Sequence, residues 1–460
     1  MFHVKHKIVY ERINMANYQT IYALSSGSLP SAIAVVRVSG PSTQKTLKIL
    51  ANMVPEPRKM VLKEIKTPEQ GVIDFSLISF FPKAQSVTGE DLAEFHLHGS
   101  VAVVEGLFLA LSSISDLRPA EAGEFTRRAL NNGKMGITEV EALSDLIAAE
   151  TREQRKQSLR QLSGELSNKY EVWRKKLIRI RAEMEAILDF SDEADVNSEG
   201  ENLTFVKDMA FLIKNIEADI IKGTAGERLR SGIKIALIGA PNVGKSSLIN
   251  LLLKEDRAIV SSEAGTTRDT IEARLDLEGI PVTIFDTAGI RKTNNKIEEE
   301  GVKRTKKTVK AADIIVSIRS PKKKEVDVSS YGIEETAKII KVFNKIDLKA
   351  NRDNISSKDL TISCKTKEGI TFLLKVLGEE TKKLTSLSDM TIGPNRLRHI
   401  AHLKETKESL QLGIEELKAG KIEIAADFTR AASMSLGRII GAVDIEDVLD
   451  DLFLGFCIGK

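Results

Sequence analysis

A glycine-rich octapeptide between two apolar segments constrains this chain more than any other feature. Residues 239–246 read Gly-Ala-Pro-Asn-Val-Gly-Lys-Ser and match the pattern G-x-x-x-x-G-K-[ST]. The apolar segment 233–238 before them predicts a buried strand, and residues 247–253 after them predict the start of a helix. In that context, backbone N–H groups and the helix N-terminus face a phosphate, so a chance glycine-rich turn is disfavoured. The sequence therefore predicts a nucleoside-phosphate site, with Lys245 near the β and γ phosphates and Ser246 on Mg²⁺.

Asp286 ends a second predicted strand. It follows the apolar run 282–285 and begins the segment Asp-Thr-Ala-Gly of residues 286–289. A carboxylate at this place can hold Mg²⁺ through a water molecule. Position 288 is Ala rather than Gln, so the group that orients the attacking water must come from elsewhere.

Asp347 indicates which base is bound. It ends the segment Asn-Lys-Ile-Asp of residues 344–347, after the predicted strand 339–343. Its carboxylate can accept both donors of the guanine edge, which adenine lacks, so GTP is favoured over ATP. Ser-Cys-Lys at 363–365 fits the last base-contacting loop, and the segments together have the order of a small GTPase domain over about 231–376. The residues of these segments expected to contact GTP are Asn242, Val243, Gly244, Lys245, Ser246, Ser247, Asp286, Thr287, Ala288, Gly289, Asn344, Lys345, Asp347, Ser363, Cys364 and Lys365.

Length and composition indicate a larger protein in a reducing compartment. A chain of 460 residues suggests about three domains. Lys and Arg (68) nearly balance Asp and Glu (65), so net charge does not indicate a nucleic-acid binder, and the local basic clusters read as solvated faces. Two cysteines suit a cytoplasmic protein. No apolar run approaches the ~18 residues of a membrane span, and residues 1–16 lack a signal-peptide core, with Met15 as a second possible start.

The periodicity of the apolar residues changes along the chain. Residues 20–120 read as mixed α/β, whereas 134–222 and 395–455 carry helical spacing around the GTPase segment. Neither helical piece has a self-sufficient apolar face, so we expect one helical domain with the GTPase domain inserted. The expected fold class is α/β and α, and the expected divisions are an N-terminal α+β domain at 17–133, helical pieces at 134–230 and 377–460, and the Ras-like P-loop domain at 231–376.

Motifs outside the GTPase segment, and one inside it, resemble one family. They are Thr-Gly-Glu-Asp at 88–91, Gly-Glu-Phe-Thr-Arg-Arg-Ala at 123–129, Ala-Gly-Thr-Thr-Arg-Asp at 264–269, and the ending Phe-Cys-Ile-Gly-Lys at 456–460. Together they resemble the bacterial TrmE (MnmE) family of tRNA-modification GTPases over essentially the whole chain from about residue 18.

The resemblance implies a potassium-activated GTPase whose G domains pair across a homodimer. A monovalent cation there takes the place of an arginine finger. Arg268 lies in the loop expected near the dimer contact, and Glu298 matches the residue that orients water, with Glu299 and Glu300 as alternative registers. The implied K⁺ ligands are Asn242, Ser261, Glu263 and Thr266, and the implied Mg²⁺ ligands are Ser246 and Thr267. The further residues expected around GTP are Ser261, Ser262, Glu263, Ala264, Gly265, Thr266 and Thr267.

The resemblance also implies a folate site in the N-terminal domain, for 5-formyl- or methylene-tetrahydrofolate. Arg37, Glu94, Lys134 and Lys460 match the family's folate contacts. Residues 27–32 depart from the family's glycine-rich stretch, and an Ala-Gly pair at 122–123 stands where Pro-Gly is usual. Cys457 has two readings, a thiol that takes part in the modification chemistry and a buried small hydrophobic residue.

The implied reaction installs an aminomethyl or carboxymethylaminomethyl group at C5 of the wobble uridine of certain tRNAs. The implied partner is a flavin-dependent subunit of the MnmG (GidA) type in a heterotetramer, since this chain has no dinucleotide-binding loop of its own. The helical domain is expected to contact tRNA and this partner. Two other functions stay open: a ribosome-assembly GTPase of the Era-like type, and a switch whose GTPase only times the binding of a partner.

Overall fold

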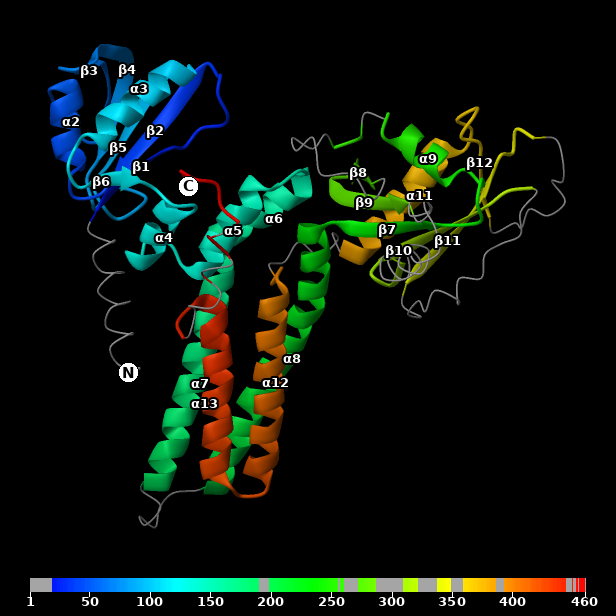
Figure 1. Ribbon diagram of the computed structural model, residues 1–460. Coiled ribbons are helices and arrows are strands. Elements are labelled where there is room, and N and C mark those ends of the chain that lie inside the picture. Colours follow the sequence, from blue (N-terminus) through cyan, green and yellow to red (C-terminus); the bar gives the residue numbers. More distant parts are fainter. Residues whose placement is uncertain are drawn as a thin grey trace, which may run out of the picture. The chain divides into compact units, whose positions relative to one another are not determined.

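The computed structural model describes residues 19–189, 198–254, 257–259, 272–286, 309–321, 337–348, 359–385, 393–443, 449, 452–453 and 455–459, with 198–202 as backbone alone (Figure 1). The chain forms two compact units. One comprises 1–144 and 440–460, and the other comprises 145–439. The four-part division expected from the sequence stays a prediction.

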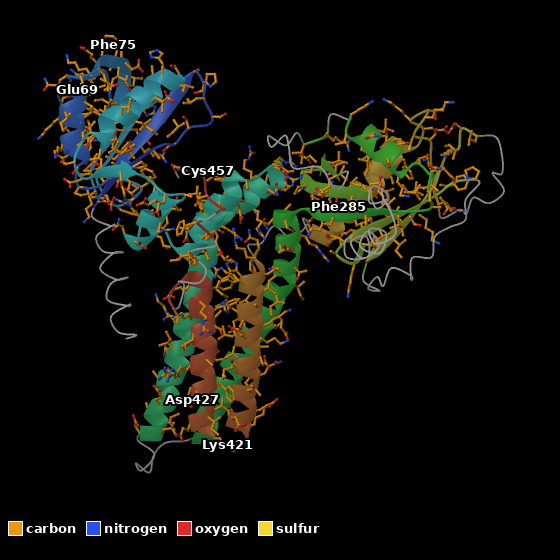
Figure 2. All side chains as sticks on the ribbon, in the orientation of Figure 1. Glu69, Phe75, Phe285, Lys421, Asp427 and Cys457 are labelled. Atoms are coloured by element: carbon orange, nitrogen blue, oxygen red, sulfur yellow. The ribbon has the colours of Figure 1, made fainter. Side chains whose placement is uncertain are left out.

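A six-stranded sheet forms the base of the first unit, in the order β3-β4-β5-β2-β1-β6. Its strands are β1 (Thr20–Leu24), β2 (Ile33–Ser39), β3 (Met60–Thr67), β4 (Gly71–Phe81), β5 (Leu92–His98) and β6 (Leu117–Pro119). Strand β5 alternates buried Phe95 with partly exposed Glu94 and His96, so the core lies on one face. Helices α2 (Thr43–Ala51) and α3 (Val101–Ser112) cover that face, and their leucines join Phe95 in one core. On the opposite face, Phe75 of β4 is 60% exposed (Figure 2).

The C-terminal residues pack into this first unit beside helices α4 (Glu124–Asn131) and α5 (Ile137–Ile147). Phe453 and Phe456 are buried against Val140. Gly123 has a φ of +67°, and a Cβ there would lie 2.7 Å from Cδ1 of Phe453, so only glycine fits. Ser25 Oγ donates to the Gly459 carbonyl at 2.8 Å, which ties the chain's last described residue to the end of β1.

Within the described ranges, five helices form the helical part of the second unit: α6 (Arg152–Leu162), α7 (Glu165–Asp189), α8 (Ser198–Ser231), α12 (Leu397–Lys418) and α13 (Ile422–Ile440). Gly413 of α12 lies against Met209 of α8, where an added Cβ would be 2.9 Å from Cε of that methionine. Thr429 of α13 contacts the sulfur of Met184 on α7 at 4.0 Å. Helices from before and after the GTPase segment therefore pack together. None of the helices in the described ranges is long and apolar enough to cross a membrane.

The GTPase segment forms a second six-stranded sheet, in the order β12-β11-β10-β7-β9-β8. The strands are β7 (Ile233–Ile238), β8 (Glu272–Leu277), β9 (Ile280–Asp286), β10 (Ile314–Arg319), β11 (Lys338–Asn344) and β12 (Leu360–Ile362). All pairings are parallel except that of the edge strand β8 with β9. Helices α9 (Lys245–Leu252) and α11 (Ile370–Thr385) complete it.

The structure confirms the strands predicted at 233–238, 282–285 and 339–343, and with them the mixed α/β fold class. The helix after the glycine-rich loop begins at Lys245, two residues before the predicted start at Ser247. Gly244, with a φ of +104°, allows the chain to turn directly into the helix.

Candidate functional site

Lys245 and Ser246 begin α9 directly after the glycine-rich loop. The Lys245 ammonium donates to the carbonyls of Gly239 at 2.7 Å and Ala240 at 3.1 Å, inside the loop. Ser246 Oγ donates to Asp286 Oδ2 at 2.6 Å, and Asp286 is buried at the end of β9. A hydroxyl and a carboxylate are the hard oxygen donors that Mg²⁺ prefers, so this pair fits the metal that GTP carries.

Asn344, buried at the end of β11, joins the phosphate loop to the base-contacting loops. Its Nδ2 donates to the Val243 carbonyl at 2.8 Å, and its Oδ1 accepts the amides of Lys345 at 2.8 Å and Cys364 at 3.3 Å. A Cβ on Gly244 would lie 2.2 Å from Asn344 Nδ2, so the loop needs glycine there. These residues meet because the carboxyl ends of parallel strands lie at one edge of the sheet.

At the same edge of the sheet, Lys345 holds Asn242 of the phosphate loop and Ser363 holds the Asp347 carboxylate. Lys345 Nζ donates to the Asn242 carbonyl at 2.6 Å, and Asn242 has a left-handed backbone with a φ of 64°. Ser363 Oγ donates to Asp347 Oδ1 at 2.7 Å, which holds the carboxylate that the sequence assigns to guanine. Burial raises the pKa of the neighbouring Cys364 thiol, against a hydrogen bond with Asn344 that lowers it.

Several predicted site residues lie outside the described ranges, and their roles stay predictions. They are Ser261, Ser262, Glu263, Ala264, Gly265, Thr266, Thr267, Arg268, Thr287, Ala288, Gly289, Glu298 and Lys460.

Among the four expected folate contacts, Arg37 and Glu94 stand opposite each other on β2 and β5, with Arg37 Nε 2.9 Å from Glu94 Oε1. The other carboxylate oxygen of Glu94 lies 3.3 Å from His96 Nε2. Lys134 instead donates to the Ala84 carbonyl at 2.9 Å. Cys457 is exposed (Figure 2), so the reading of a buried hydrophobic residue is wrong.

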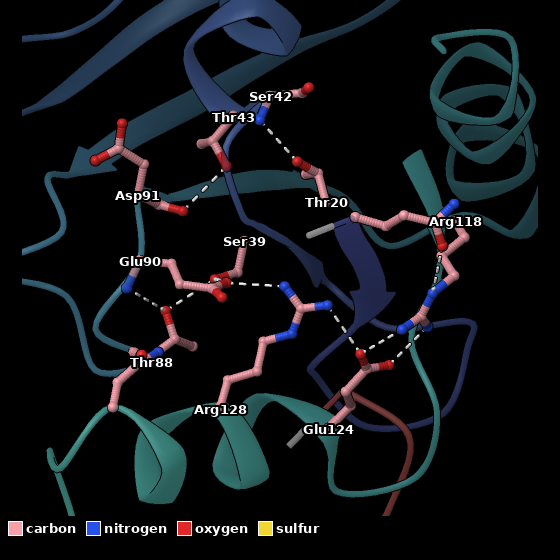
Figure 3. Close-up of polar contacts among 12 residues, drawn as sticks. Thr20, Ser39, Ser42, Thr43, Thr88, Glu90, Asp91, Arg118, Glu124 and Arg128 are labelled. Carbon is pink, nitrogen blue, oxygen red and sulfur yellow. Dashed lines mark hydrogen bonds and ion pairs between the residues drawn. The ribbon is translucent and has the colours of Figure 1, made fainter. Parts of the chain in front are cut away.

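A buried ion-pair network in the first unit was missed by sequence reasoning (Figure 3). Arg128 is 3% exposed and donates to Glu90 Oε2 and Glu124 Oε1, both at 2.9 Å. Arg118 donates through Nη1 and Nη2 to the two oxygens of Glu124, at 2.8 and 2.6 Å. Burial opposes ionisation of Glu124, but hydrogen bonds from Arg118, the Glu121 amide and Arg128 outweigh it and lower the pKa of Glu124.

This network accounts for Glu90 in the segment 88–91 and for Glu124 and Arg128 in the segment 123–129. It joins α4 to the loop before β5, and Thr88 and Ser39 continue it through a hydroxyl pair at 2.8 Å. The signal in the sequence was a glutamate in each motif together with the adjacent arginines. Pairing across 38 residues is not a local property, so the sequence alone did not predict it.

The parallel strand ends bring a phosphate loop, an Mg²⁺-type oxygen pair and a guanine-type carboxylate to one edge of the second sheet. Together with the fold, they define a P-loop GTPase. Comparison with known proteins adds the family. A family model described as the MnmE helical domain matches residues 137–457, and one described as the GTP-binding protein TrmE N-terminus matches residues 20–134.

The tRNA modification GTPase MnmE of Bradyrhizobium sp. (strain ORS 278) is 42% identical over 449 residues, covering 96% of this chain and 99% of that protein. The protein of the same name from Brucella canis is 43% identical over 444 residues, with 96% and 98% covered. The chain belongs to the MnmE family of tRNA modification GTPases. A solved G domain of the T. maritima FeoB iron transporter aligns with 32% of this chain and 98% of that chain, at 23% identity and a TM-score of 0.23, too weak an overlap to bear on function.

Proposed function

We propose that the chain is a potassium-activated GTPase that modifies C5 of the wobble uridine of certain tRNAs together with a flavin-dependent subunit of the MnmG type. The GTPase activity in tRNA modification follows from the family. The observation that carries the proposal is the strand-end site, where Lys245, the Ser246–Asp286 pair and Asp347 lie on one sheet edge. The product is an aminomethyl or carboxymethylaminomethyl group, and the working form is a homodimer, joined with the flavin subunit in a heterotetramer, in the cytoplasm.

Asn242 supports the potassium step. The Lys345 ammonium holds the Asn242 carbonyl at 2.6 Å, which fixes the backbone of the phosphate loop at this residue. The amide oxygen of an asparagine is a ligand type that hard cations accept. A monovalent cation beside this loop would supply positive charge to the β–γ bridging oxygen, the charge that an arginine finger supplies elsewhere. We assign Asn242, Ser261, Glu263 and Thr266 to K⁺, and Ser246 and Thr267 to Mg²⁺.

Arg37 and Glu94 support the folate step. Their side chains are 31% and 18% exposed, so the pair is partly open to solvent on the sheet face opposite the helices. A carboxylate can accept the amino and N–H donors of a pterin, and a guanidinium can meet carboxylates or carbonyls. We propose that these two residues, with Lys134 and Lys460, hold 5-formyl- or methylene-tetrahydrofolate, and that Cys457 acts beside them.

Nucleoside mass spectrometry of bulk tRNA tests the proposal. A strain that lacks the chain is complemented with wild type and with Asp286→Ala. We expect C5-modified wobble uridines to return only with wild type. An unchanged tRNA profile in the deletion strain would contradict the proposal and favour a ribosome-assembly GTPase.

The rate of GTP hydrolysis in K⁺ and in Na⁺ tests the cation assignment separately. We expect K⁺ to accelerate the wild-type enzyme, and Asn242→Ala to lose this difference. Equal rates in the two salts for wild type would refute the potassium site.

A further inference from the structure

The turn between β8 and β9 contacts helix α6 of the same unit (Figure 1). The Glu153 amide, in the first turn of α6, donates to the Gly279 carbonyl at 3.3 Å. Gly279 has a φ of +87°, and a Cβ there would lie 3.0 Å from Cγ of Glu153, which is 7% exposed. The turn and the helix are therefore in close contact, and a side chain at Gly279 would strain the turn and displace the Glu153 side chain.

Two ion pairs flank this contact. Arg274 of β8 lies 3.2 Å from Glu150, just before α6, and Lys382 of α11 lies 3.1 Å from Glu278 in the turn. All four side chains are partly exposed, between 33% and 50%, so each pair stabilises the protein only weakly. The first pair joins β8 to the segment before α6, and the second joins the turn to α11.

The same helix also holds the chain segments that lead into and out of the GTPase domain. Gln154, Gln157 and Gln161 each donate through Nε2 to a backbone carbonyl: those of Arg230 at 3.0 Å, Gly226 at 3.0 Å and Gly393 at 3.3 Å. Their i, i+3, i+7 spacing places the three amides on one helix face. The end of α8 and the segment before α12 are thus both fastened to α6.

The β8–β9 hairpin connects this helix to the nucleotide site. Strand β9 is seven residues long and ends at Asp286, the partner of Ser246, so the turn and the Mg²⁺ ligands are about 20 Å apart at ~3.3 Å per residue. In sequence, β8 begins at Glu272, five positions after the expected Mg²⁺ ligand Thr267. Strand β8 is at the edge of the sheet and pairs antiparallel with β9. A change at the Asp286 end of β9 therefore reaches the turn through a short, stiff ribbon.

We propose that α6 positions the β8–β9 hairpin and thereby couples the nucleotide state to the helices on either side of the GTPase domain. Glu150 holds β8 through Arg274, the Glu153 amide holds the turn, and the three glutamines pass the displacement of the hairpin to the end of α8 and to the segment before α12. The inference rests on the proposed GTPase function and names its regulation. Coupling is reciprocal: if the turn meets α6 differently with GDP and with GTP, then loosening the contact must change the ratio of the two affinities.

Equilibrium binding of GDP and of a non-hydrolysable GTP analogue to the full-length chain measures this ratio. We expect Gly279→Ala to change the ratio of the two Kd values by about fivefold or more, the lower end of typical coupling between sites. Glu150→Ala and Arg274→Ala should each change it by about twofold, as for a partly exposed pair. The double variant should do no more than either single one, because they break the same contact. The matched control is the exposed pair Arg179–Glu183 on α7, 2.8 Å apart, whose removal should leave the ratio unchanged.

A contact that only stabilises the fold would lower the unfolding temperature and move both Kd values equally. An unchanged ratio in Gly279→Ala, Glu150→Ala and Arg274→Ala, each still able to bind GDP, would therefore overturn the coupling while leaving the GTPase function intact. Failure of the wild-type chain to bind either nucleotide would instead refute the proposed function, and the inference with it.

Discussion

Gly244→Ala tests the geometry of the phosphate loop. Gly244 has a φ of +104°, where a side chain costs about 1–3 kcal/mol. The added Cβ would lie 2.2 Å from Asn344 Nδ2, so Asn344 must move and lose its bond to the Val243 carbonyl, at about 1 kcal/mol. The total is about 2–4 kcal/mol, or about 30- to 700-fold in Kd at 1.4 kcal/mol per factor of ten. If the phosphate loop keeps its shape in the variant, this free energy lowers the stability of the folded protein. If the loop relaxes to avoid the clash, the same free energy weakens GDP binding instead.

Fluorescent GDP binding and thermal unfolding of the same variant measure the two parts. The control is Gly420→Ala in the turn between α12 and α13, where φ is +76° but nothing lies within 4 Å of an added Cβ. This control should change the Kd for GDP less than about twofold. Adding Asn344→Ala should remove the clash, so the double variant should cost less than the sum of the single ones. A Gly244→Ala protein that binds GDP and unfolds as wild type does would refute the reasoning.

Four further predictions concern individual residues. Asp219→Ala in the helical part leaves the fully buried Tyr170 hydroxyl without its acceptor, which lies 3.1 Å away. The free energy of unfolding should therefore fall by about 1–3 kcal/mol, and Tm should fall with it. Tyr170→Phe should lower the free energy of unfolding by less. Burial, and then the Asp219 carboxylate, raise the pKa of Tyr170 above its ordinary value of 10.0. The stability that the neutral phenol contributes is therefore present below pH 10 and is lost as the pH rises further. Denaturant titrations at alkaline pH should show a smaller loss of stability for Tyr170→Phe than for wild type. Asp347→Asn should shift binding from guanine toward xanthine nucleotides, which competition assays would show, and an unchanged affinity for GTP would contradict the base contact. Alkylation at pH 8 should label the exposed Cys457 before Cys364, because the raised pKa of Cys364 leaves little thiolate until the pH rises further. Mass spectrometry of the two peptides would show the order of labelling. Equal labelling rates would contradict this prediction.

Local sequence is enough to predict the strands and loops of the nucleotide site. Segments 233–246, 282–286 and 339–347 each combine an apolar strand with the polar loop that follows it, so strand and ligand lie within a few residues of each other. Parallel strands then bring such loops to one edge, whatever the rest of the chain does. The places of Asp286 and Asp347 at or just after the strand ends, and of Lys245 after the glycine-rich loop, therefore follow from local sequence alone.

Which distant polar groups meet depends instead on how the elements pack in three dimensions. Asn344 reaches Val243 across 101 residues, Arg128 reaches Glu90 across 38, and Gln161 reaches the Gly393 carbonyl across 232. In local sequence, Arg128 and Gln161 look like ordinary solvated residues of a helix, and Asn344 reads as a nucleotide contact with no sign that Val243 is its partner. Their partners are set by how strands and helices pack, because a buried polar group must find a hydrogen bond wherever the fold places it.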